Sequence, residues 1–285
     1  VDWTPTTENT AGDLRLNSGS QIVKAYDTRQ EILVWTEDAL FSMRFVGPPF
    51  TFGHNVLSRN TTLIGPNAVA SLDGAVYWMG LRDFFFYTGR VQELPSTVRD
   101  YVFGDINLLQ AHKIHAGTIK DYGEILWFYC SSDATEIDRY VIYNSFEECW
   151  YFGTLSRTAW LDSASRDYPI GANSTDYKIY NHEIGLNDGE GTSPSGISAY
   201  VESADFELGE GDKFQFISRV LPDISFFGST DPAPAASFSF KPRNFPGSAF
   251  GTADTSTVTG TKMVDVQEFT EQAFIRVRSR QVAFR

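Results

Sequence analysis

Three arginines near the end of the chain stand at every second position: Arg276, Arg278 and Arg280. In a β-strand this spacing places the three guanidinium groups on one face and Ile275 and Val277 on the other. A solvated strand face is one interpretation. In a chain with a formal net charge of −13, the three cations could equally bind an acidic neighbouring subunit. Phosphate binding is the least favoured alternative, and our hypothesis is a subunit interface.

Other groups that could do chemistry lack the partners that the chemistry requires. His112 and His115 are three positions apart, but no cysteine or third ligand is near them in the sequence, so no zinc site is predicted. The segment Asn187–Gly191 lacks the regularly spaced ligands of a calcium loop, and a solvated turn is favoured. Neither a G-x-S-x-G elbow nor a Walker loop occurs. We predict no enzymatic activity, and no catalytic residue, metal ligand or cofactor.

Three further groups of residues have a simpler structural interpretation. The segment Ser71–Trp78 resembles the Asp-box turn of sialidase-type propellers, but it is one residue short, and a tight turn at Asp73-Gly74 is the favoured interpretation. The 36 acidic residues would allow many pairs of carboxylates of the kind that glycosidases use, so we nominate none. Cys130 and Cys149 flank one hairpin and could pair, although reduced thiols are favoured.

The elements that must position these residues are β-strands. A hairpin motif recurs three times, and its first strand ends each time in a tryptophan. These are Trp35, Trp78 and Trp127, which are 43 and then 49 residues apart. A period of roughly 40 to 50 residues built from strands is typical of β-propeller blades. Because the three indoles lie inside strands, we predict that they form the structural core.

The predicted fold class is all-β: a partial or complete β-propeller with an additional C-terminal β-sandwich-like region. Residues 1–21 are predicted to be a connecting segment, 22–190 the propeller blades, and 191–285 either closing strands or a separate β domain. A fourth, weaker copy of the motif spans 158–185, with Tyr177–Tyr180 in place of the tryptophan strand. The best helix candidate is Pro95–Phe103, with Pro95 or Ser96 as its cap. Strands are predicted at 197–208, 214–224, 236–240 and 264–284.

Composition limits the function classes. The 23 Phe, 13 Tyr and 6 Trp suit pleated, half-buried strands, and no apolar run approaches the length of a membrane span. The negative charge argues against tight binding of nucleic acid and is compatible with a surface along which DNA slides. The chain begins without Met and stops inside an alternating pattern, so we expect it to be a segment of a longer protein.

Several segments resemble one known family. They are Asp27–Trp35, Phe45–Phe50, Val76–Gly80, Tyr101–Asn107 and Phe274–Gln281. From about Leu14 to Phe284 the chain is similar to the tail hub or nozzle proteins of short-tailed bacteriophages, also called packaged-DNA stabilisation proteins. Members of that family are generally longer than this chain.

The resemblance implies a propeller-based subunit of a six-fold ring in the virion tail, assembled in the host cytoplasm. Such a ring lies below the portal and the head-to-tail adaptor and prolongs the DNA channel, through which DNA passes without specific binding. It helps to retain the packaged genome and carries tail fibres, spikes or a needle.

The leading hypothesis is therefore a structural virion protein, and the alternative is a glycan-binding or glycan-hydrolysing β-propeller module. A hydrolase should bring acids and an arginine cluster together on loops, whereas the arginines here follow a regular strand spacing. A sugar-binding module should expose Trp or Tyr on loops, whereas Trp35, Trp78 and Trp127 lie in strands. A protein-binding propeller of the WD or kelch kind should carry dipeptide signatures that are absent.

Overall fold

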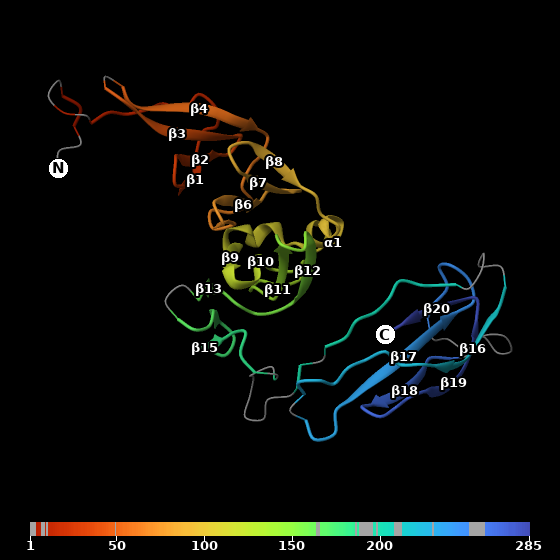
Figure 1. Ribbon diagram of the computed structural model, residues 1–285. Coiled ribbons are helices and arrows are strands. Elements are labelled where there is room, and N and C mark those ends of the chain that lie inside the picture. Colours follow the sequence, from red (N-terminus) through yellow and green to blue (C-terminus); the bar gives the residue numbers. More distant parts are fainter. Residues whose placement is uncertain are drawn as a thin grey trace. The chain divides into compact units, whose positions relative to one another are not determined.

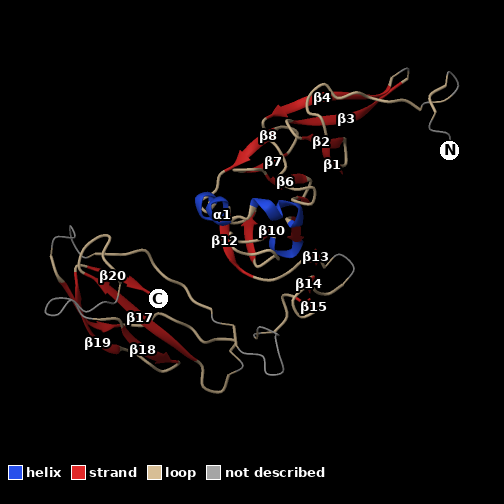
Figure 2. Cartoon of the chain, turned by 180° about the vertical axis from the view of Figure 1, so that it is seen from behind, coloured by secondary structure: helices blue, strands red, loops and turns tan. Residues whose placement is uncertain are grey.

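A computed structural model of the chain describes residues 4–6, 9, 11–48, 50–163, 166–185, 187, 196–197, 199–207, 213–229, 231–250 and 260–285. The chain divides into two compact units, residues 1–189 and 190–285. Antiparallel strands dominate both units (Figure 1). Within the described residues, helix occurs only at α1 (Arg99–Asp105) and in two short 3₁₀ turns (Figure 2). The all-β prediction is confirmed, and the sheets are open, none of those described closing on itself.

The first unit contains three four-stranded antiparallel sheets, each built from strands that follow one another in the chain. The first sheet comprises β1 (Ile22–Asp27), β2 (Ile32–Thr36), β3 (Ala39–Gly47) and β4 (Thr51–Arg59). The second comprises β5 (Val69–Leu72), β6 (Ala75–Met79), β7 (Phe84–Tyr87) and β8 (Val91–Leu94). The third comprises β9 (His115–Ile119), β10 (Glu124–Tyr129), β11 (Arg139–Asn144) and β12 (Cys149–Thr154). The hairpins predicted from the tryptophan spacing are the central strand pair of each sheet.

Local turn chemistry explains why these strands reverse where they do. Between β5 and β6, Leu72 pairs with Ala75 across a two-residue turn. The turn residues Asp73 and Gly74 have φ angles of 50° and 85°, which is the left-handed geometry that tight hairpins require and that this dipeptide favours. The predicted Asp73-Gly74 turn is therefore present.

The three sheets share one aromatic core. Trp35 on β2, Trp78 on β6 and Trp127 on β10 are each 0% exposed. The rings of Trp35 and Trp78 meet edge to face with centroids 5.3 Å apart. The indole Nε1 of Trp127 donates a hydrogen bond of 3.1 Å to the carbonyl of Ala68, which precedes β5. Each repeated tryptophan thus joins its sheet to a neighbouring one.

The fourth copy of the motif differs from the prediction. It is a three-stranded sheet of β13 (Ala159–Leu161), β14 (Ile170–Asn173) and β15 (Lys178–Asn181). The segment that was expected to replace the tryptophan strand forms the third strand, and β14 is the second. Tyr177 lies in the turn before β15, with a positive φ of 58° and 91% of its surface exposed, so it does not enter a core.

The helix forms later in the chain than predicted. Helix α1 begins at Arg99 rather than at the predicted caps, and its N-cap is Val98, which makes no side-chain capping bond. Two contacts fix Pro95 and Ser96 in the preceding loop. The carbonyl of Pro95 accepts a hydrogen bond of 2.9 Å from Trp150 Nε1, and Ser96 Oγ accepts one of 3.3 Å from the amide of Val98.

The second unit is a small two-layer β structure. One layer pairs β16 (Gln215–Val220) with β19 (Ala273–Ser279), and the other has the order β18 (Lys262–Gln267), β17 (Ala235–Arg243), β20 (Gln281–Phe284). Ile275 and Val277 on β19 pack with Phe240 on β17 and Val282 on β20, so the apolar faces of the two layers form the core.

Two strand predictions for this unit were wrong. Residues 199–207 do not form the predicted strand and make only an isolated bridge between Phe206 and Val282. The predicted strand 264–284 is divided among β18, β19 and β20, because the chain turns after Gln267, where Thr270 hydrogen-bonds back to it. Of the segment Asn187–Gly191, only Asn187 is among the described residues.

Candidate functional site

The first strands of the sheets in the first unit lie side by side. Asn67, just before β5, forms a parallel bridge with His115 at the start of β9, and its carbonyl accepts a 2.8 Å hydrogen bond from the amide of Ala116. Tyr26 on β1 donates a 3.1 Å hydrogen bond to Ser71 Oγ on β5. These contacts set β1, β5 and β9 next to one another.

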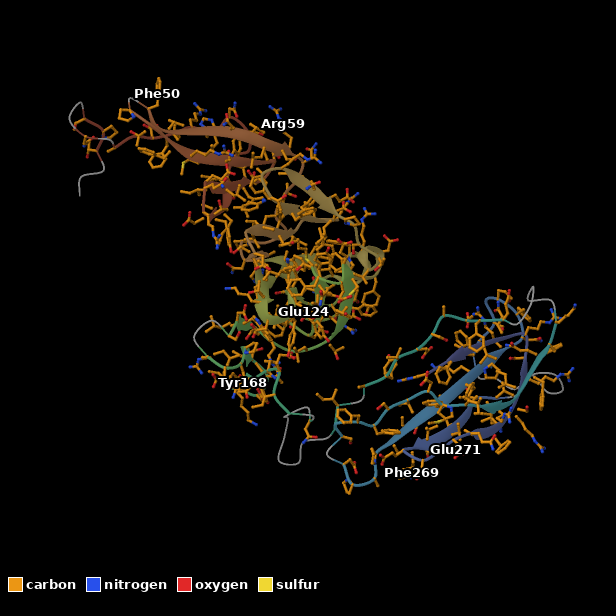
Figure 3. The ribbon with its side chains drawn as sticks, in the orientation of Figure 1. Phe50, Arg59, Glu124, Tyr168, Phe269 and Glu271 are labelled. Atoms are coloured by element: carbon orange, nitrogen blue, oxygen red, sulfur yellow. The ribbon has the colours of Figure 1, made fainter. Side chains whose placement is uncertain are left out.

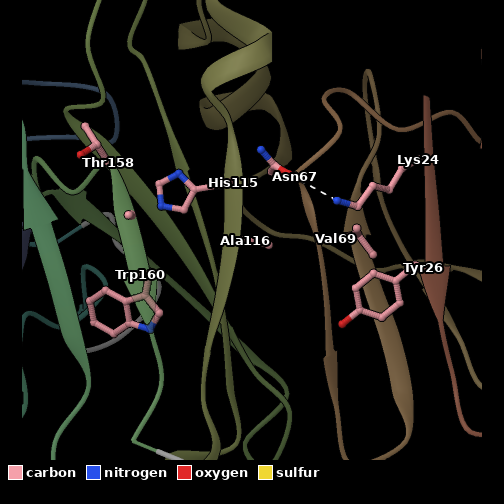
Figure 4. A pocket seen from close by; sticks show the side chains of 9 residues that line it. Lys24, Tyr26, Asn67, Val69, His115, Ala116, Thr158 and Trp160 are labelled. Atoms are coloured by element: carbon pink, nitrogen blue, oxygen red, sulfur yellow. Dashed lines mark hydrogen bonds between the residues drawn. The ribbon is translucent and has the colours of Figure 1, made fainter.

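A groove of about 340 Å³ opens along these strands, and we call it the first-strand groove (Figure 4). Each of the four sheets contributes to its lining. The polar and aromatic members are Lys24, Tyr26, Asn67, His115, Thr158 and Trp160. Lys24 carries the single formal charge among the lining residues, and its Nζ donates to Asn67 Oδ1 over 3.5 Å.

His115 is the titratable ring of the groove. It stacks on Phe128 with the ring centroids 4.9 Å apart and the planes 15° from parallel. Burial lowers its pKa, although the carbonyl of Lys113, 3.4 Å from Nδ1, acts in the opposite direction. The imidazole is therefore neutral at pH 7, and its buried Nε2 has no hydrogen-bond partner among the described residues.

Trp160 forms the wall on the side of the fourth sheet. Its Nε1 donates a 3.0 Å hydrogen bond to the carbonyl of Thr118, and its ring packs on Phe128. Gly117 permits this close approach, because a Cβ atom at that position would lie 2.4 Å from Trp160 Cδ1. The indole is thus fixed against β9.

The lining defines what the groove can do chemically. It offers hydrogen bonds, one ammonium group, an imidazole and the rings of Tyr26 and Trp160 to a bound molecule. The pair of facing carboxylates that glycoside hydrolysis requires is not among its lining residues. The groove is therefore suited to contact with a polar or anionic molecule.

A second, larger pocket of about 910 Å³ lies at the other ends of β1 and β5, beside Glu31 and Tyr87. The side chain of Glu31 is 3% exposed. Its Oε2 accepts a 2.7 Å hydrogen bond from Arg44 Nε, and its Oε1 accepts one from the hydroxyl of Tyr87. This carboxylate therefore joins the first sheet to the second.

The charge state of Glu31 follows from its surroundings. Burial opposes ionisation, but hydrogen bonds from Arg44, Tyr87 and Ser42 outweigh it and lower the pKa of the carboxyl group. The pKa of Tyr87 is raised, first by burial and then by its bond to Glu31. The site therefore contains a carboxylate that accepts hydrogen bonds from a neutral phenol and a guanidinium group.

The predicted arginines lie in the second unit. Along β19 exposure alternates: Arg276 and Arg278 are exposed, whereas Ile275 and Val277 are buried. The guanidinium groups of Arg278 and Arg280 lie over the ring of Phe214, with 4.8 and 5.2 Å to the centroid. The structure thus places these two arginines on one side of the sheet; their role at a subunit interface stays a prediction.

Sequence reasoning missed the groove and Glu31. The groove residues lie on or directly before the first strand of each of the four sheets, and no local pattern marks them. The spacing of the tryptophans could have located these strands, because each first strand occupies the same place in its repeat. The described residues contain no cluster of three or more His, Cys, Asp or Glu side chains able to hold a metal ion. Cys130 and Cys149 are both free thiols.

Comparison with known proteins identifies neither a family nor a function for this chain. No family model and no curated protein matches the sequence. Solved structures similar to part of the chain include a Bacteroides fragilis protein described as exported. It is 9% identical, and the match covers 54% of this chain and 67% of that one with a TM-score of 0.26. A likeness this low supports no inference about fold or function. In the described part of the chain, no helix has the length and apolar character needed to cross a membrane.

Proposed function

We propose that this chain is a non-enzymatic structural protein: a propeller-type subunit of a six-fold ring, of the kind that forms the tail nozzle of short-tailed bacteriophages. In that role it extends the DNA channel below the portal and adaptor, helps to retain packaged DNA and anchors fibres, spikes or a needle. It would belong to the virion tail and assemble in the host cytoplasm.

The observation that carries this proposal is the arrangement of the sheets in the first unit. Consecutive antiparallel sheets place their first strands side by side and share one aromatic core, as propeller blades do around an axis. Because Trp35 and Trp78 are in contact and Trp127 bonds to Ala68, the sheets brace one another. Such bracing suits a channel wall loaded by packed DNA.

Charge is consistent with this role. Tight binding of DNA requires several cations that neutralise neighbouring phosphates. The first-strand groove presents Lys24 alone, and the chain as a whole has a net charge of −13. A surface of this kind lets DNA pass without holding it.

The contact between subunits is proposed to use Arg276, Arg278 and Arg280. A ring is built from head-to-tail interfaces in which two different surfaces complement each other. Arg276 and Arg278 project from an exposed strand face, and the chain has acidic residues in excess elsewhere. These arginines can therefore meet an acidic surface of the next copy.

The test is the mass and symmetry of the purified particle, measured by mass photometry and cryo-electron microscopy. We expect a six-fold ring for the unmodified chain. The triple change of Arg276, Arg278 and Arg280 to Glu should leave a folded monomer. The matched control changes Arg15, Arg90 and Arg166, all exposed in the first unit, to Glu and should keep the ring.

Two results would contradict the proposal in different ways. A ring that survives the triple change removes the arginine interface but keeps the ring. An unmodified chain that remains monomeric at all concentrations removes the nozzle role itself.

Glycan binding is the second candidate, favoured by the rings of Tyr26 and Trp160 in the first-strand groove. Aromatic faces beside polar groups are the surfaces on which sugars stack. A glycan array separates the two functions. Signal that is lost on Trp160→Ala, in a variant that circular dichroism shows to be folded at the assay temperature, would favour this candidate.

A further inference from the structure

The hairpin formed by β3 and β4 extends beyond the rest of its sheet. The pairing of β2 with β3 ends at Ile32 and Met43, whereas β3 and β4 stay paired as far as Gly47 and Thr51. Residues 44–48 and 50–53 therefore form a two-stranded projection, which we call the arm. Phe50 lies at its far end (Figure 3).

The arm exposes large apolar side chains. Phe45 is 70% exposed, Val46 58% and Phe50 79%, and Phe45 meets Phe52 edge to face with centroids 5.8 Å apart. Clustered apolar groups of this size on a projecting hairpin mark a surface that another molecule covers.

The base of the arm is fixed. Arg44, the first arm residue, donates its Nε hydrogen bond to the buried Glu31, which also accepts from Tyr87 on the second sheet. The direction of the arm is therefore set before any partner arrives, and binding loses less conformational freedom than a loose loop would.

The charge of the hairpin indicates the chemistry of its partner. From Ala39 to Asn60 the sequence contains no aspartate or glutamate, although the chain has 36 of them. Its charged residues are Arg44, at the base of the arm, and Arg59, which pairs with Ala39 at the opposite end of the hairpin. The hairpin thus fits an apolar surface with an acidic border. A membrane is less favoured, because a chain with a net charge of −13 is repelled by anionic lipid.

The chain itself provides such a surface on its third sheet. Strand β12 lies at the edge of that sheet, so its outer backbone groups are open to a further strand. Phe152 on β12 is 49% exposed, and its ring meets that of Tyr101 of α1 with the centroids 4.3 Å apart and the planes tilted by 39°. Glu147 and Glu148 precede the strand, and Asp100 precedes Tyr101. We call these residues and β12 the β12 surface.

We propose that the arm of one copy binds the β12 surface of the next copy, head to tail. The apolar arm then covers Tyr101 and Phe152, and Arg44 at the base of the arm faces the glutamates of the partner surface. The two surfaces differ, so the contact is heterologous and can close into a ring. This inference rests on the ring of the proposed function and names a second contact within it.

Disulfide trapping tests the contact directly. Cys149 opens β12 and is partly exposed, whereas Cys130, the other cysteine of the chain, is buried. Val46 and Phe52 are changed to Cys one at a time, and the full chain is oxidised with copper phenanthroline. A disulfide forms only when the two Cα atoms come within about 7 Å of each other. We expect covalent dimers and longer ladders from at least one variant.

Two controls define the background. Adding Cys149→Ser to each arm variant should abolish the ladder. Ile179→Cys, at a residue that is 72% exposed on β15, should give none.

Sedimentation velocity supplies the second measurement. The double change Phe45→Ser and Phe50→Ser should weaken self-association at least tenfold. The matched control changes Phe227 and Phe269, which are 100% and 88% exposed in the second unit, to Ser and should leave it unchanged. Melting curves of each variant show that it is folded.

The outcomes separate this inference from the proposed function. Rings that persist in the arm variant, with no ladder from any cysteine, overturn the arm contact and keep the nozzle role. An unmodified chain that never self-associates overturns both. Pelleting with anionic vesicles that is lost in the arm variant, while rings persist, shows that the arm binds lipid and overturns the protein contact.

Discussion

Glu31 is a single side chain on which two sheets of the first unit depend. Its carboxylate is nearly inaccessible, and it accepts hydrogen bonds from Arg44 on its own sheet and from Tyr87 on the next. Removing one partner of such a buried network leaves polar groups without full compensation, which costs more than the network contributes when it is complete.

The pH dependence of this network follows from the direction in which the pKa of Glu31 is shifted. Because the native pKa of Glu31 is lowered, its ionised form stabilises the fold above the unfolded pKa of about 4.3, and this stabilisation is lost as pH falls through the native pKa. Glu31→Gln should therefore lower the free energy of unfolding by about 1 to 3 kcal/mol at pH 7. Urea titrations from pH 7 to pH 3 should show this difference shrinking below about pH 4.3. A difference that does not change with pH would contradict the assignment.

Trp78 is the second residue with a measurable consequence. It is fully buried between Trp35 and Phe85, so Trp78→Ala opens a cavity that the surrounding strands cannot fill. We expect a loss of about 3 to 5 kcal/mol in the free energy of unfolding, measured by urea titration followed by circular dichroism. Leu109→Ala, at a residue that is 86% exposed, should change it by less than about 0.5 kcal/mol. A loss below about 1 kcal/mol for Trp78→Ala would show that the residue is not core.

At the scale of elements, the joint between the third and fourth sheets depends on a glycine. A Cβ atom on Gly117 of β9 would meet the indole of Trp160 at 2.4 Å, so Gly117→Ala must displace Trp160. We expect a destabilisation of about 1 to 3 kcal/mol and a changed tryptophan emission spectrum. Gly104→Ala is the control, because that position in α1 has open space and alanine favours helix. Equal melting temperatures for the two variants would disprove a tight joint.

Elements that depend on local sequence could be predicted, whereas elements that depend on contacts between distant residues could not. The tryptophan hairpins could be predicted because their strands alternate and turns such as Asp73-Gly74 are encoded locally. The limits of α1 could not, because a distant indole, Trp150, holds Pro95 outside the helix. The groove was equally hidden: Lys24, Asn67 and His115 meet only because three sheets place their first strands together.

At the scale of the whole molecule, the two units have separate cores. The aromatic core of the first unit contains Trp35, Trp78 and Trp127, whereas that of the second contains Phe240, Ile275, Val277 and Val282. All six tryptophans of the chain lie between residues 3 and 160. Tryptophan emission therefore reports on the first unit, whereas far-ultraviolet circular dichroism reports on both.

This distribution predicts two unfolding transitions. In urea, the tryptophan curve should follow the first unit alone, and the dichroism curve should show a second transition at a different midpoint. A separately produced fragment of residues 1–189 should reproduce the tryptophan curve. Coincident curves for the full chain, together with a shifted curve for the fragment, would show that the units unfold as one.

The order of strand pairing also determines when each unit can fold during synthesis. Every sheet of the first unit pairs strands that are consecutive in the chain, so each can form soon after it leaves the ribosome. In the second unit β16 pairs with β19, and β17 pairs with β20, both of which come much later in the chain. The two pairings are interleaved, because β17 lies between β16 and β19 in the sequence. That unit cannot be completed until Phe284 has emerged, so its apolar strands stay exposed to chaperones long after the tryptophan core has closed.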